Sequence, residues 1–180
     1  MRSGIVAIVI LRPSIAVFAL FSVAFAQTED SRIGPIRKGA IAVGAALQAG
    51  DFGGVIDLTY PAIVELMGGR EKGIESVVEQ MNTLKEHNIS ITSFTVGDPS
   101  EIKTGGSELF SVLPTSIEMK APQTKITGKS FLIAISGDQG KSWFYADGSN
   151  LTPDLMKTLF PKFPPELKLP EKSNSVEKIP

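Results

Sequence analysis

The chain has 180 residues, no cysteine, one histidine and a formal net charge of −1. That length suits one domain with extensions, and the missing cysteine excludes a disulfide framework, thiolate metal sites and thiol catalysis. The lysines alternate with acidic residues instead of forming the basic patch of a nucleic-acid-binding protein, so we expect no nucleic-acid partner.

The first 26 residues, MRSGIVAIVILRPSIAVFALFSVAFA, contain two arginines, no acid and long apolar runs. A positive start, an apolar middle and an Ala-x-Ala end are typical of a secretory signal peptide. We therefore expect export to the periplasm or the medium, cleavage after Ala26 and no membrane attachment afterwards. The alternative is an uncleaved N-terminal anchor, although Arg12 leaves an apolar run from Pro13 to Phe25 that is short for a membrane span.

Residues 27–34 form a polar lead, after which the apolar residues of PIRKGAIAVGAALQAGDF recur at steps of three and four. These are Ile36, Ala40, Val43 and Leu47. Such spacing predicts a helix, which ends at Gly50 because glycine readily adopts the left-handed conformation that terminates helices. Asp51 is the expected N-cap of a second helix. Pro61 ends that helix, because the residue before a proline avoids helical angles.

The segment PAIVELM can form a short turn that begins with its proline and stops at Gly68-Gly69. A third helix is expected in REKGIESVVEQMNTLKEHN, at residues 70–88. Its apolar stripe consists of Ile74, Val77, Val78, Met81 and Leu84. Acids near its start and Lys85 and His87 near its end match the helix dipole.

After Asn88 the apolar period changes to two, which predicts four antiparallel strands. They are expected at residues 89–97, 107–120, 124–137 and 141–147. In the first strand, Ile89 and Ile91 stand in opposite phase to Phe94 and Val96, which predicts a bulge or burial on both faces. The third strand ends in a continuous apolar run, which predicts a segment covered on both sides.

The turn before the last strand, SGDQGKSW at residues 136–143, resembles the Asp-box, a short hairpin best known from sialidase-type β-propellers. A propeller requires its unit in every blade, and this sequence contains the motif once. We therefore interpret it as a tight hairpin in which Asp138 bonds the loop backbone and Trp143 packs over the turn. A glycan-binding role is the alternative, and it requires Trp143 to be exposed.

A short closing helix is expected from Thr152, a good N-cap, to Phe160. The tail that follows, residues 161–180, is rich in proline and lysine. We expect its first half to lie extended on the domain and its second half to be disordered, because it contains few residues that could form a core.

Three helices followed by four antiparallel strands and a short helix define an α+β fold. We expect the helices of residues 35–160 to pack in the concave face of a curved sheet. This arrangement resembles the nuclear transport factor 2-like superfamily, a cystatin-like α+β cone. The segments LQAGDFGGVIDLTYP, GGREKGIESVVEQMNTL and GKSWFYADGS are similar to its second helix, its third helix and its final strand. The likeness spans roughly residues 35–150, and PAIVELMG stands where many members have a short hairpin.

The resemblance implies one of two kinds of function. Some members are enzymes that act on small apolar substrates with carboxylates and a tyrosine inside the cone, and others bind ligands or proteins without catalysis. We expect an exported non-catalytic domain that binds a small apolar ligand or forms a homodimer through the open face of the sheet. The alternative is a small-molecule enzyme, of the isomerase, cyclase or hydrolase type, that uses a pocket acid and a tyrosine.

The candidate catalytic residues are Tyr60, Asp57 and Asp147, and the candidate ligand-binding residues are Tyr60, Trp143, Tyr145 and Asp147. Trp143, Tyr145 and Asp147 share one face of the last strand, so they form an aromatic pocket with one acid if that face lines the cavity. Each candidate also has a structural interpretation: Asp57 as a solvated acid, Tyr60 as a packing tyrosine, and Asp147 as a turn residue.

Two further acids, Glu65 and Glu118, are weaker candidates for a pocket carboxylate. His87 stands at a helix end, where we expect it to cap carbonyls in solvent. One histidine without cysteine argues against a zinc site, and no phosphate-binding glycine loop is present. We therefore expect neither a metal nor a cofactor.

Overall fold

The structure, a computed structural model, describes residues 30–179, so the predicted signal peptide of residues 1–26 lies outside the described residues. The helices of the first half are α1 (Ile33–Ala49), α2 (Phe52–Leu58), α3 (Pro61–Leu66) and α4 (Arg70–Glu86). The strands are β1 (Ser90–Val96), β2 (Lys103–Gly105), β3 (Glu108–Ala121), β4 (Thr124–Ser136), β5 (Phe144–Asp147) and β6 (Ser173–Lys178). Between β5 and β6 lie the 3₁₀ helix η1 (Gly148–Asn150) and the helix α5 (Pro153–Leu159).

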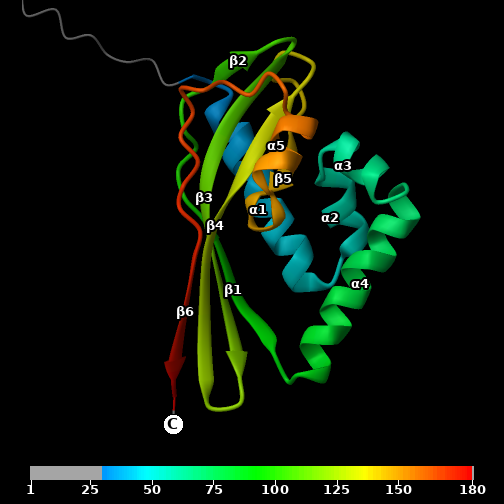
Figure 1. Ribbon diagram of the computed structural model, residues 1–180, viewed down its shortest axis with the longest axis vertical. Helices are drawn as coiled ribbons and strands as arrows, with labels where there is room; N and C mark the ends of the chain where they lie inside the picture. The colour runs from blue at the N-terminus through cyan, green and yellow to red at the C-terminus, as the bar shows by residue number, and fades with distance from the viewer. Residues whose placement is uncertain (1–29, 180) are drawn as a thin grey trace, which may run out of the picture.

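The strands of the described part form one antiparallel sheet in the order β1-β3-β4-β5, with β2 beside β3 and β6 beside β4. On the outer edge of β4, residues 132–135 pair with β5 and residues 124–129 pair with β6. Figure 1 shows the long strands β3 and β4 curving past helix α1 down to their hairpin. The α+β class with helices packed on a curved sheet, as predicted from the sequence, is confirmed.

The predicted helices follow one another in the expected order, and the turn that begins at Pro61 is the short helix α3. Helix α1 packs against β1 and β4, α2 packs against α1, and α4 packs against α2 and α3, which makes α4 the outermost helix in Figure 1. Gly73 is the one buried residue of α4, and a Cβ atom there would lie 3.1 Å from Ile56 Cδ1 of α2. No helix within residues 30–179 combines the length and the apolar character needed to cross a membrane.

The predicted end signals occupy the expected positions. Gly50 closes α1 with a φ of +73°. The Asp51 carboxylate accepts a hydrogen bond of 2.9 Å from the Gly54 amide at the start of α2. The Thr152 hydroxyl accepts one of 3.2 Å from the Leu155 amide at the start of α5.

The upper half of the sheet, which contains residues 109–113 of β3 and 131–136 of β4, is buried on both faces. The cluster between this half and α1 contains Ile36, Ala40, Leu113, Leu132, Ala134, Trp143 and Tyr145. The cluster on the opposite face contains Phe110, Val112, Phe131, Ile133, Ile135, Ala146, Leu151, Phe160 and Leu167. The predicted burial of the apolar run of β4 on both sides is therefore confirmed, since residues 131–136 are all buried.

The change of phase in β1 is a bulge, as predicted. The register between β1 and β3 shifts between Ile91 and Ser93. Ile91 consequently lies opposite Met119, and Phe94 lies opposite Ile117. Since Ile117 and Met119 are two residues apart in β3, the bulge returns both apolar side chains of β1 to one face of the sheet.

The tail differs from the expected disorder of its second half. Its first half packs on the domain through Leu167, which is 6% exposed. Its second half contains β6, which pairs with β4 although every side chain of the strand is exposed. The physical reason is that β5 leaves half of the β4 edge without a partner, so the tail gains backbone hydrogen bonds without needing a hydrophobic composition.

Candidate functional site

A cleft of about 470 Å³ opens beside the lower half of the sheet, residues 115–121 of β3 and 124–130 of β4. Its apolar wall consists of Leu47 from the end of α1, Phe94 from β1 and Ile117 from β3. Its polar wall consists of Asp147 and Ser149 from the end of β5 and from η1, and of Lys172, Ser173 and Asn174 from the tail. Segments from both ends of the domain therefore meet at this cleft.

The floor of the cleft is made of small residues. Thr115 lies opposite Ser130, and Ile117 lies opposite Gly128, so these side chains share one face of the sheet. A Cβ atom on Gly128 would lie 3.1 Å from both the Ile117 Cγ2 atom and the Asn174 Oδ1 atom. The cavity exists because the large apolar side chains of the upper half of the sheet give way to Thr, Ser and Gly here.

The hydroxyl of Ser130 is buried and has no hydrogen-bond partner among the described residues. Buried polar groups in folded proteins are nearly always bonded. A hydroxyl on the floor of a cleft, with its bonding capacity unused, is therefore a group to which a ligand could bond.

Two contacts fix the polar wall. The Asp147 carboxylate accepts hydrogen bonds of 2.9 Å from the Ser149 amide and of 2.5 Å from the Ser149 hydroxyl. The Lys172 ammonium donates to the carbonyl oxygens of Gly148, Ser149 and Leu151 at 3.1, 3.3 and 3.2 Å. The first contact holds the end of β5, and the second ties the tail to η1.

Asp147 is the one predicted site residue that lines the cleft. Trp143 and Tyr145 lie in the core against α1, where they are 7% and 3% exposed. The Tyr145 hydroxyl donates a 2.7 Å hydrogen bond to the carbonyl of Ile36, and burial raises the pKa of Tyr145. The structure does not bring these three residues together as an aromatic pocket, and the glycan-binding alternative is wrong because Trp143 is not exposed.

The other candidate catalytic residues lie elsewhere. Asp57 forms an exposed ion pair with Arg70, with N–O distances of 2.6 and 2.9 Å, and the hydrogen bonds from Arg70 lower its pKa. The Tyr60 hydroxyl donates to Glu108 Oε1 at 2.8 Å. Burial, together with this carboxylate, raises the pKa of Tyr60 to about 12. The three candidates therefore have separate partners and do not form one catalytic site.

Sequence reasoning missed Glu108 as the partner of Tyr60, because nothing in the sequence links positions 48 residues apart. Among the weaker candidates, Glu65 is exposed and Glu118 pairs with Lys125 at 2.8 Å. His87 is exposed and follows α4 as its C-cap residue. Within residues 30–179, His, Asp and Glu side chains do not gather in a group that could hold a metal ion.

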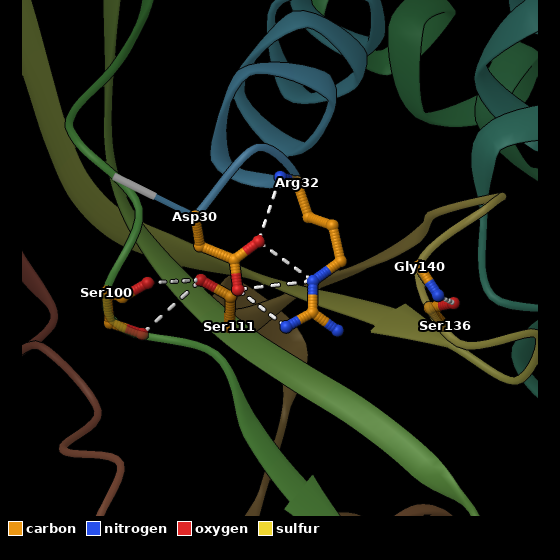
Figure 2. Close-up of polar contacts among 6 residues, drawn as sticks. All are labelled: Asp30, Arg32, Ser100, Ser111, Ser136 and Gly140. Atoms are coloured by element: carbon orange, nitrogen blue, oxygen red, sulfur yellow. Dashed lines mark hydrogen bonds and ion pairs between the residues drawn. The ribbon is translucent and has the colours of Figure 1, made fainter. Parts of the chain in front are cut away.

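Figure 2 shows a second set of polar contacts, near the start of α1. The Arg32 side chain and amide donate to the Asp30 carboxylate at 2.5 to 3.2 Å, and these bonds lower the pKa of Asp30 to about 2. The Ser111 hydroxyl donates to the Ser100 carbonyl at 2.9 Å. The Ser136 hydroxyl accepts a bond of 2.8 Å from the amide of Gly140. The Asp30–Arg32 and Ser136–Gly140 contacts are local, and the Ser100–Ser111 contact joins the loop after β1 to β3. Each group has a protein partner, so this set stabilises loops and offers little to a ligand.

Comparison of the chain with family models, with curated proteins and with solved structures found no match in any of the three. The resemblance to the nuclear transport factor 2-like superfamily therefore stays a prediction that depends on the helix and strand motifs.

Proposed function

We propose that the protein is an exported, non-catalytic module that binds a small apolar ligand with one polar end in the cleft. The observation that carries the proposal is the cleft itself, in which an apolar wall faces a polar wall across a floor of small residues. Its volume of about 470 Å³ is typical of small-molecule sites, which range over about 300 to 1,000 Å³.

The two walls suit the two parts of such a ligand. Leu47, Phe94 and Ile117 are each partly exposed, so a bound apolar chain removes their surface from water, which stabilises the complex by about 25 cal/mol per Å². On the floor between the walls, the Ser130 hydroxyl offers a donor to a carboxylate or hydroxyl group, and the neighbouring Lys129, which also lines the cleft, offers a second. Export is part of the proposal because of the N-terminal signal pattern of the sequence.

The enzyme alternative receives no such support. A general acid or base must reach the substrate directly or through one water. Asp57 and Tyr60 lie outside the lining of the cleft, and the Asp147 carboxylate is engaged with Ser149.

The proposal is tested with decanoate and 1-decanol as probes, titrated calorimetrically into the protein. We expect decanoate to bind with one site per chain and Gly128→Val to weaken it at least tenfold, because the new side chain fills the floor between Ile117 and Asn174. Gly137→Val is the matched control, since nothing lies within 4 Å of a Cβ atom at Gly137. Absence of binding to the wild type, or equal binding to Gly128→Val, would contradict the proposal.

The same titration separates ligand binding from self-association, the other half of the prediction. Phe94 packs against α1, so the cleft lies on the helix-covered face of the sheet, whereas the homodimer was expected to form through the open face. Binding of one decanoate per chain at every protein concentration supports the ligand site. Heats of dilution that show a dissociating dimer, without binding of decanoate, would favour the homodimer.

A further inference from the structure

The C-terminal strap, which we define as residues 172–178, forms part of the proposed ligand site. Its first three residues, Lys172, Ser173 and Asn174, line the cleft. The pairing of β5 with β4 ends at Leu132, and the pairing of the strap begins at Lys129. Within residues 30–179, the edge of β4 is therefore without a strand partner at positions 130 and 131, and the cleft is next to this interruption.

Side-chain packing contributes little to holding the strap. Every residue of β6 is exposed, and Val176, its one apolar residue, is 70% exposed. By contrast, Tyr145 and Ala146 of β5, on the same edge of β4, are buried. A segment held by backbone hydrogen bonds with few buried apolar contacts opens at a much lower free energy than the core.

In the part of the chain that the structure describes, one side chain of the strap, Lys172, is hydrogen-bonded to the body of the domain. The Lys172 ammonium has three N–H donors, and they meet the carbonyls of Gly148, Ser149 and Leu151 at 3.1 to 3.3 Å. The chain just before the strap is anchored by Leu167, which is buried in the core. Opening is therefore confined to the residues that follow Leu167, and it requires the Lys172 contacts to break.

We propose that the strap is a gate for the cleft: residues 172–178 detach from β4 to admit or release the ligand, and Lys172 is the latch that keeps them closed. This inference rests on the proposed function, because a gate needs a ligand site behind it. It adds that the opening of the strap sets the rates at which the ligand enters and leaves that site.

The latch is tested by hydrogen exchange, without any ligand. We expect Lys172→Ala to speed amide exchange at least tenfold in residues 173–178 and in residues 124–129 of β4, while residues 132–135 stay as protected as in the wild type. Lys168→Ala, an exposed lysine earlier in the same tail, should leave all three segments unchanged. Equal exchange of the strap in Lys172→Ala and the wild type would overturn the latch.

The gate is tested by locking it. The chain has no cysteine, and Thr127 lies directly opposite Ser175 in the pairing of β4 with β6. In the double variant Thr127→Cys, Ser175→Cys, an intramolecular disulfide should slow decanoate association and dissociation at least tenfold, as measured by NMR line shapes, and reduction should restore both rates. The reduced double variant is the internal control.

The outcomes separate the two proposals. Equal rates in the locked and reduced proteins would overturn the gate while leaving the ligand site intact. A disulfide-linked dimer would also overturn it, because the strap would then occupy the β4 edge of a second copy. Failure of every protein to bind decanoate would contradict the proposed function, and the exchange experiment would still show whether Lys172 holds the strap.

Discussion

Among single residues, Asp138 shows how one carboxylate organises a whole loop, the hairpin between β4 and β5. It accepts hydrogen bonds from the amides of Ser142 and Lys141 at 2.9 and 3.0 Å and from the hydroxyl of Ser136 at 2.8 Å. The bonds from Ser142 and then Ser136 lower the pKa of Asp138 from 3.8 to about 2. The predicted role of Asp138, to tie the loop backbone, is confirmed.

The lowered pKa predicts how stability depends on pH. A carboxylate whose pKa is lower in the folded than in the unfolded state stabilises the fold above the unfolded pKa, and this contribution is lost as the pH falls through the folded pKa. Asp138 should thus lose its contribution between about pH 4 and pH 2. We expect Asp138→Asn to be less stable at pH 7 and to show a shallower loss of stability over that interval, as measured by urea unfolding. Identical slopes for the two proteins would show that the loop bonds do not depend on the charge.

At the scale of elements, the position of α1 on the sheet depends on small residues in the helix. The side chain of Tyr145 crosses α1 at Gly39 to reach the Ile36 carbonyl. A Cβ atom at Gly39 would overlap the Tyr145 hydroxyl. Glycine at this position costs about 1 kcal/mol in helix propensity relative to alanine. It allows α1 to pack closely against β5.

We predict that Gly39→Ala lowers the free energy of unfolding by about 1 to 3 kcal/mol, the usual effect of overpacking in a core. Gly34→Ala is the matched control, because it lies in the same helix and nothing lies within 4 Å of its added Cβ atom. We expect the control to be unchanged or slightly more stable. Denaturant unfolding measures the free energy of unfolding of both variants. A Gly39→Ala variant that is as stable as Gly34→Ala would contradict the close packing of Tyr145 on α1.

The elements differ in how far the sequence predicted them. Period and end signals located α1, α2, α4 and the long strands, including the bulge of β1, because those features are encoded by neighbouring residues. Strand β6 was missed because its residues have no apolar pattern and are held by the backbone of β4. Its formation depends on the free edge that β5 leaves, which lies far away in the sequence.

For the molecule as a whole, the sequence predicted a curved sheet with helices on it but only part of the candidate site. Strand alternation correctly placed Tyr145 and Asp147 on one face, yet it could not show that α1 covers Tyr145 while Asp147 lines a cleft beside the end of α1. The polar wall also needs the tail, whose position depends on the three carbonyl contacts of Lys172. These features follow from packing between distant segments, which local patterns do not record.

The central claim is that a ligand occupies the cleft between the end of α1, the lower half of the sheet and the C-terminal strap. Methyl NMR during titration with decanoate tests it most directly. The account predicts that the methyl signals of Leu47, Thr115 and Ile117, which line the cleft, move with added probe, while those of Ile133 and Ile135 in the opposite core stay in place. Shifts centred on Ile133 and Ile135, or no shifts at all, would contradict the account.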